Sequence, residues 1–160
     1  MEGPIASCKE NAVRGMEVFL KTFSFVPDDK LTWTPAPTAK SAIRIAAHTA
    51  LYAGRFARMI SDRRLLSTEN LAEWLARNNA EEEALTSRTE VERLFRKNTA
   101  EVIVALDSLK PEDVETILDT GIGWTMPMTF LMSLPGLHAM AHAGQIDYLQ
   151  TCWGDQEVHF

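Results

Sequence analysis

Three of the four histidines, His48, His138 and His142, are the residues best suited to chemistry in this sequence. His138 and His142 are four residues apart. On an α-helix, that spacing returns a side chain to within about 40° of its starting direction after about 6 Å of rise. Two neutral imidazoles placed in this way can share one metal ion, and imidazole suits zinc, nickel, copper and iron. On its own, this spacing more often reflects a coincidence or hydrogen-bonded histidines in a protein core.

Two further observations favour a metal site. Residues 120–146 contain no Asp, Glu, Lys or Arg, so the histidine pair lies in the most apolar segment of the chain. An unpaired imidazole is costly to bury in such a segment. His48 lies on the apolar side of another expected helix and could supply a third ligand. Three histidines would leave a fourth position open for water or substrate, as in catalytic zinc sites.

Other catalytic motifs are missing from the sequence. There is no HExxH motif, because Ala139 follows His138, and no histidine is preceded at three residues by glutamate, which argues against a ferritin-like di-iron bundle. The GxGxxG, GxxxxGK[ST] and GxSxG motifs are also missing. The sequence therefore leaves the catalytic residues unknown.

Apolar periodicity predicts four long helices that would position the histidines, at residues 7–25, 41–61, 88–109 and 127–153. A polar connection with a short helix around residues 69–77 separates the second helix from the third, and it is long enough to cross the end of a bundle. Residues 110–126 are expected to form a turn or short extended structure. Pro135 removes a backbone hydrogen bond within the fourth helix and is expected to bend it.

Several polar and apolar side chains are expected near the histidines. Tyr52 lies one turn after the first histidine and either packs or touches a ligand. Asn98 is either a satisfied core amide or a contact to the metal ligands or substrate. Gln145 could orient an imidazole, because metal-bound histidines usually donate their second N–H to a partner. Met16 and Phe23 are expected to line a mostly apolar pocket around the open position.

Other candidate groups are expected to take no part in chemistry. Glu81-Glu82-Glu83 is interpreted as a solvated run of charge. Cys8 and Cys152 are interpreted as inert buried thiols. His159 is expected in a frayed tail, as neither ligand nor catalyst.

The composition indicates a single domain spanning residues 1–160, with 46% hydrophobic and 24% charged residues. The net charge of −6 argues against a nucleic-acid partner. The first residues do not resemble a signal peptide. Residues 120–146 are interpreted as a loop and a buried helix rather than a membrane span, because two histidines and a glutamine would be costly in lipid. The two cysteines lack metal-binding spacing, and a cytoplasmic location is expected.

The second expected helix carries a face of mostly small residues, which allows close approach of another helix either within the bundle or across a dimer interface. This face comprises Ile43, Ala46, Ala47, Ala50, Gly54 and Ala57. Together with the tryptophan-bearing loops, this surface leads us to expect a homodimer, because exposed apolar patches usually mark interfaces.

Three pieces of the sequence resemble the DinB-like superfamily of four-helix-bundle metalloproteins, which includes bacillithiol- and mycothiol-dependent transferases. The first is the loop PDDKLTWTPAPTAKS at residues 27–41. The second is His48, about seven residues into the second helix. The third is HAMAHAGQI at residues 138–146, followed by Tyr148-Leu149. Their order and spacing cover nearly the whole chain.

This resemblance implies an all-α, up-down-down-up four-helix bundle with a long crossover between its second and third helices, commonly a homodimer. It implies a zinc- or nickel-type ion held by His48, His138 and His142. The implied activity is transfer of a low-molecular-weight thiol to a small molecule, or a related hydrolysis. Ala139, where many relatives have glutamate, and Pro135 depart from the family pattern. The alternative is a non-catalytic bundle that binds a small ligand or a partner, with a structural metal or none.

Overall fold

The computed structural model describes residues 3–66, 70–119 and 123–159. Its longer helices are α1 (Pro4–Ser24), α2 (Ala42–Asp62), α3 (Leu71–Ala84), α4 (Arg88–Asp107) and α6 (Met128–Cys152). Its shorter elements are a 3₁₀ turn (Asp28–Lys30), α5 (Pro111–Val114), β1 (Ile117–Asp119) and β2 (Thr125–Pro127). The prediction of an all-α fold with four long helices is confirmed.

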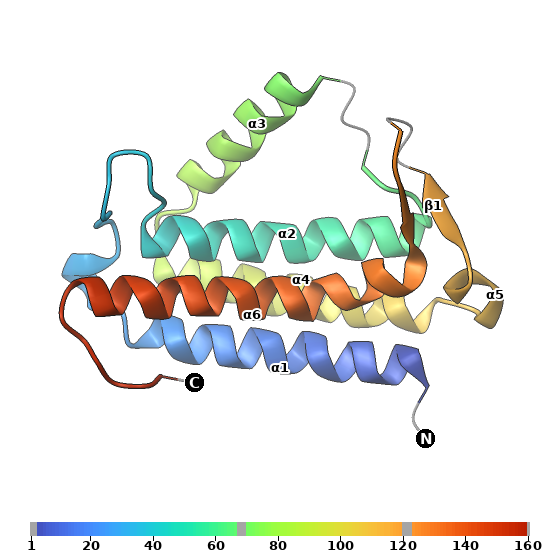
Figure 1. The fold of residues 1–160 in the computed structure, drawn as a ribbon, viewed down its shortest axis with the longest axis horizontal. Helices are drawn as coiled ribbons and strands as arrows, with labels where there is room; N and C mark the ends of the chain where they lie inside the picture. The colour runs from blue at the N-terminus through green and yellow to red at the C-terminus, as the bar shows by residue number, and fades with distance from the viewer. Residues whose placement is uncertain (1–2, 67–69, 120–122, 160) are drawn as a thin grey trace.

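Helices α1, α2, α4 and α6 lie side by side as a bundle (Figure 1). α2 and α4 run in one direction, and α1 and α6 run in the other, in agreement with the expected up-down-down-up order. α1 packs mainly on α6, while α2 packs on both α4 and α6. The chain crosses from α2 to α4 through α3, which lies outside the bundle, above α2 in Figure 1.

Two glycines allow α1 and α6 to approach closely. A Cβ atom on Gly136 would lie 2.7 Å from the backbone oxygen of Asn11, and one on Gly15 would lie 2.9 Å from the backbone oxygen of Gly136. Any larger side chain would push the helix backbones apart. α6 continues through Pro135, which is buried in this contact region.

The small-residue face of α2 lies within the bundle. The core consists of two clusters of buried apolar side chains, one around Phe19 and Phe23 and a second around Leu106 and Leu131. Ala46, Ala47 and Ala50 are fully buried in the first cluster, and Ala57 is buried in the second. This surface is therefore covered by the protein's own helices, and the expectation that it offers a dimer interface is wrong.

Helix α3 is longer than the sequence predicts, and ion pairs attach it to α2. Its N-terminus is capped by Asn70, whose side chain accepts a hydrogen bond from the Glu73 amide. Its C-terminal turns carry the acidic run. All three glutamates pair with basic residues on α2 or in the loop just before it. The pairs are Glu82 with Lys40, Glu83 with Arg44 and Glu81 with Arg55. The interpretation of this run as merely solvated is wrong.

The C-terminal segment folds back onto α1 instead of fraying. His159 is buried, stacks on Phe25 with ring centroids 4.2 Å apart, and pairs with Asp155. The expectation that His159 lies in a frayed tail is therefore wrong. Cys152 is exposed and Cys8 is half-buried, so the interpretation of both thiols as buried is also corrected.

The connector left undecided by the sequence forms α5 and a short antiparallel hairpin. Leu118 of β1 pairs with Met126 of β2, and Leu118 is buried against the second core cluster. None of the helices within the described residues is long and apolar enough to span a membrane.

Candidate metal centre

The structure brings the three predicted histidines together at the contact between α2 and α6. Nε2 of His138 lies 3.3 Å from Nε2 of His48 and 3.0 Å from Nε2 of His142. The ligand atoms of all three lie within 4.8 Å of one another. Tetrahedral coordination with metal–nitrogen bonds of 2.0–2.1 Å separates ligand atoms by about 3.3 Å. The spacing of the histidine nitrogens therefore fits a shared ion.

Hydrogen bonds on the outer side of two rings define where their protons lie. Nδ1 of His48 is 2.7 Å from Oε1 of Glu82, and Nδ1 of His142 is 2.7 Å from Oε1 of Gln145. Both oxygens only accept, so each Nδ1 carries the proton and each Nε2 presents a lone pair to the same point. The neutral His138 ring has a single N–H, so it cannot donate a hydrogen bond to the Nε2 atoms of both other histidines at once. A cation at this point would satisfy all three nitrogens, so the donor set fits a divalent metal.

Burial keeps two of the rings neutral. It lowers the pKa of His138 to about 3, with further lowering from His142, His48 and Lys40. Burial also lowers the pKa of His142, against an opposing effect of the Gln145 hydrogen bond. Neutral imidazole is the form that binds metal, so these two rings need lose no proton at pH 7.

Glu82 is the main site residue that the sequence did not reveal. Its side chain is 2% exposed and contacts His48, Lys40 (2.5 Å) and Arg44 (3.4 Å). Burial alone would raise the pKa of Glu82, but hydrogen bonds from His48 and Lys40 outweigh it and hold the pKa at about 2. The sequence did contain a signal: Lys40, Arg44 and His48 recur every four residues, a spacing that places basic side chains on one side of a helix, where an acidic residue can pair with them.

Tyr52 forms part of the wall around the histidines. Its ring lies 4.3 Å from that of His48 and 5.1 Å from that of His138, measured between centroids. The guanidinium carbon of Arg55 lies 4.6 Å from the centroid of the Tyr52 ring. Burial raises the pKa of the Tyr52 hydroxyl. The packing role expected for Tyr52 is thus present, directly against two candidate ligands.

Asn98 lies in the contact between α2 and α4. Its Nδ2 donates a hydrogen bond to the Ala50 carbonyl at 2.8 Å, and a Cβ on Gly54 would lie 2.8 Å from the same nitrogen. Asn98 is thus a hydrogen-bonded core amide, as one of the two sequence interpretations holds. Met16 and Phe23 are buried in the core cluster, so the expectation that they line the pocket is wrong.

A cavity of about 560 Å³ opens beside His48 and His142. Most of its walls are apolar and come from the loop before α2 and from the exposed side of α6. The lining comprises Pro35, Ile45, Ala141, Gly144, Tyr148 and Leu149, with Lys40, Gln145 and the two histidines as its polar groups. A small apolar molecule in this cavity would reach the two imidazoles.

Residues 12–146 match the DinB superfamily. Among solved structures, a DinB-like protein from Bacillus subtilis is 19% identical, with a TM-score of 0.68 and 96% of each chain covered. A mycothiol-dependent maleylpyruvate isomerase is 14% identical, with a TM-score of 0.64; the match covers 90% of this chain but only 61% of the isomerase. At these identities the likeness shows a shared fold. No curated protein matches the sequence.

Proposed function

The chain belongs to the DinB superfamily, and from this premise we propose that His48, His138 and His142 hold one zinc or nickel ion in a metal-dependent enzyme. The observation that carries the proposal is the convergence of three Nε2 atoms on one point. At least two of these atoms, those of His48 and His142, carry no proton and can only accept. A cation is the partner that such an arrangement lacks.

The proposed reaction is transfer of a low-molecular-weight thiol to a small apolar electrophile, with a related hydrolysis as the second possibility. A divalent ion with neutral ligands lowers the pKa of water or a thiol at its open position. The largely apolar cavity suits an uncharged electrophile. One structural relative is named for its dependence on mycothiol. In the transfer, sulfur bonds to carbon, the leaving group departs with its electron pair, and the thiol proton passes to solvent.

The chain's own residues orient the ligands and shape the substrate space. Glu82 and Gln145 fix the rings of His48 and His142 through their Nδ1 atoms. Tyr52 covers two of the rings, and Tyr148 lines the cavity. These contacts predefine the ligand geometry, which lowers the cost of binding an ion.

A direct activity test uses protein loaded with zinc or nickel. Bacillithiol, mycothiol or glutathione is supplied with an aryl halide or an epoxide, and thioether formation is followed. Turnover is expected for the wild type and for the control His159→Ala, and is expected to vanish in His48→Ala. Equal background rates for all three proteins with every thiol and both metals would reject the enzyme and favour the non-catalytic binding module.

The proposal extends to a homodimer formed through α6. Apolar or small residues recur along its exposed side at spacings of four and three: Phe130, Leu134, Leu137, Ala141, Gly144 and Tyr148. We name this set the α6 seam. A repeat of about 3.5 residues is typical of helices that pair with another helix. A second copy would supply the same seam and cover the cavity beside the histidines.

A further inference from the structure

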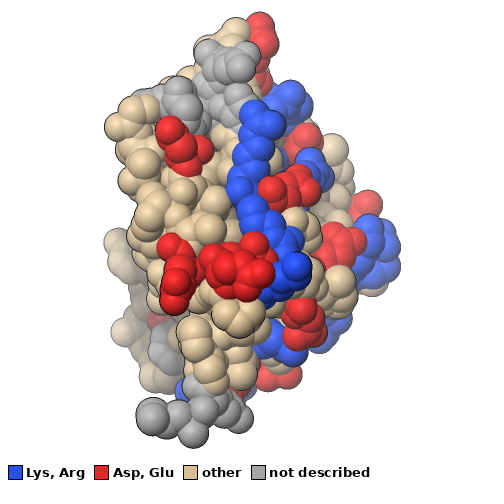
Figure 2. Space-filling view, turned by 90° about the vertical axis from the view of Figure 1, so that its right-hand side faces the viewer, with Lys and Arg blue, Asp and Glu red and all other residues tan. Residues whose placement is uncertain are grey.

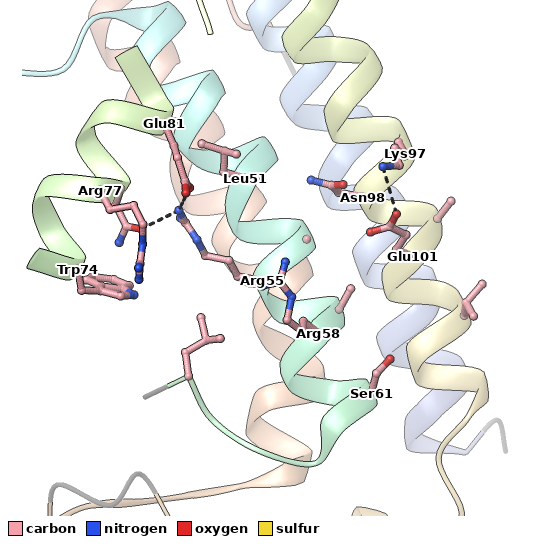
Figure 3. Close-up of a pocket in the computed structure, with 16 residues that line it drawn as sticks. Leu51, Arg55, Arg58, Ser61, Trp74, Arg77, Glu81, Lys97, Asn98 and Glu101 are labelled. Atoms are coloured by element: carbon pink, nitrogen blue, oxygen red, sulfur yellow. Dashed lines mark hydrogen bonds and ion pairs between the residues drawn. The ribbon is translucent and has the colours of Figure 1, made fainter. Parts of the chain in front are cut away.

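A second cavity lies away from the histidines, where α3 stands off from α2 and α4. Its volume is about 1020 Å³, in the range of small-molecule sites. Figure 3 shows Trp74 and Arg77 entering it from α3, Arg55 and Arg58 from α2, and Asn98 and Lys97 from α4. We name this space the arginine cleft.

The charges in the arginine cleft do not balance. Its acidic residues are already paired, Glu81 with Arg55 and Glu101 with Lys97. No hydrogen bond or ion pair joins Arg58 or Arg77 to any residue in the described part of the chain, and both side chains are exposed. Two guanidinium groups therefore face the cleft without an anion, in a chain whose net charge is −6.

The wall between these arginines also has more donors than acceptors. Nη2 of Arg55 donates to Asn78 Oδ1 and Glu81 Oε2, both at 2.7 Å. Nη1 of Arg55 and Nδ2 of Asn78 are buried without a hydrogen-bond acceptor among the described residues. Arg55 and Asn78 are 9% and 5% exposed, so water offers these donors little compensation. Both atoms lie beneath the surface of the cleft, so they add to the positive character of its wall without themselves contacting a ligand.

We propose that the arginine cleft is a second binding site, for a small organic anion whose phosphate or carboxylate head group binds the guanidinium group of Arg77 and whose flat apolar part lies against Trp74, with Arg58 adding positive charge from the α2 side of the cleft. Guanidinium groups match the geometry of both head groups and bind them through paired N–H donors. Leu51, Leu66 and the Trp74 ring supply the apolar wall for the remainder of the molecule.

This site is separate from the candidate metal centre, although Tyr52 links the two. The Tyr52 ring contacts the rings of His48 and His138. The Trp74 ring from α3 and the Arg55 guanidinium from α2 lie 6.5 Å and 4.6 Å from its centroid. No histidine lines the arginine cleft. Anion binding there therefore goes beyond the proposed enzyme function and requires no metal.

The test is a calorimetric titration of metal-free protein with phenyl phosphate, compared with inorganic phosphate and benzyl alcohol. Metal-free protein prevents the phosphate from binding an ion at the histidines. Phenyl phosphate is expected to bind once per chain and more tightly than either comparison ligand. Inorganic phosphate lacks the aromatic ring, and benzyl alcohol lacks the anionic head group. Carrying out the same titration with benzoate shows whether a carboxylate head group is preferred.

Two double variants that remove the same charge identify the site. Arg58→Gln/Arg77→Gln is expected to weaken phenyl phosphate binding at least tenfold. Arg93→Gln/Arg96→Gln, on exposed positions of α4 outside the cleft, is expected to change it less than twofold. His142→Ala is expected to leave it unchanged. Absence of saturable binding, equal losses in both double variants, or loss in His142→Ala would overturn the proposal, whatever the outcome for metal or thiol transfer.

Discussion

At the scale of single residues, the candidate metal centre depends on side chains that hold the histidines from outside. The Nδ1 contacts with Glu82 and Gln145 direct two Nε2 lone pairs inward. Glu82 comes from α3, outside the four-helix bundle, and hydrogen bonds from His48 and Lys40 lower its pKa and so retain its negative charge. α3 is therefore part of the site as well as a crossing between helices.

Replacing Glu82 by glutamine tests this outer contact. Glu82→Gln keeps the size of the side chain but removes the charge that makes the His48 ring a stronger ligand. We expect the dissociation constant for zinc or nickel to rise about 10- to 100-fold, the usual effect of losing such a partner. Competition with a chromophoric chelator measures it. Glu83→Gln, which loses only the exposed pair with Arg44, is the control and should bind as the wild type does.

The buried histidines also predict how the stability of the metal-free protein depends on pH. The pKa of His138 is about 3 when folded and about 6.5 when unfolded. Between these values the unfolded chain binds one more proton, so stability is full above pH 6.5 and falls as the pH decreases. The slope from His138 is about 1.4 kcal/mol per pH unit.

Urea unfolding at pH 6.5, 5.5 and 5.0 checks this dependence. The range lies above the unfolded pKa of Glu82, about 4.5, below which its own contribution is lost. His138→Gln cannot take up this proton, so its stability should fall less steeply than that of the wild type. Parallel curves for the two proteins would show that His138 is not kept neutral by the fold.

At the scale of elements, the sequence predicted the long helices well because their apolar periodicity is strong. The expected 41–61 and 127–153 agree closely with α2 and α6. The length of α3 was underestimated because its last turns are held by charged contacts with α2 and not by an apolar stripe. Periodicity cannot reveal such contacts. For the same reason Glu82 was missed, whereas the histidine trio followed from helix spacing and from the family resemblance.

The contact between α1 and α6 predicts that Gly136 cannot be enlarged. In Gly136→Ala the new Cβ would lie 2.7 Å from the Asn11 backbone oxygen, so the helices must separate. We expect a loss of about 1–3 kcal/mol in the free energy of unfolding, although alanine is the better helix former. Chemical denaturation measures it, with Glu17→Ala on the exposed side of α1 as a control that stays within about 0.5 kcal/mol. Equal stability of Gly136→Ala and wild type would contradict the close packing.

At the scale of the whole molecule, charge is distributed unevenly. Figure 2 shows the molecule from the end at which the hairpin and α5 lie; the side that carries α6 has few charged side chains, and most lie toward α4. Within the α6 seam, Phe130, Leu137 and Tyr148 are each at least half exposed. Such a surface is typical of an interface.

A charge placed in the α6 seam tests the proposed homodimer. Sedimentation of the wild type at micromolar concentration should give twice the chain mass of 17.9 kDa. Leu137→Glu should give the monomer with unchanged helix content, because Leu137 is exposed and its replacement disturbs no core contact. Val104→Glu, which changes an exposed residue of α4, should remain dimeric. A monomeric wild type at this concentration would contradict the proposed homodimer.

The most direct test of the central claim is the metal content of protein made without a histidine tag. Zinc or nickel is added, the excess is removed, and bound metal is quantified by mass spectrometry for three proteins. We expect one ion per chain in the wild type, one in His159→Ala, whose histidine lies elsewhere, and none in His142→Ala with its helix content retained. No bound ion in the wild type, or one ion per chain in His142→Ala, would contradict a metal centre at His48, His138 and His142.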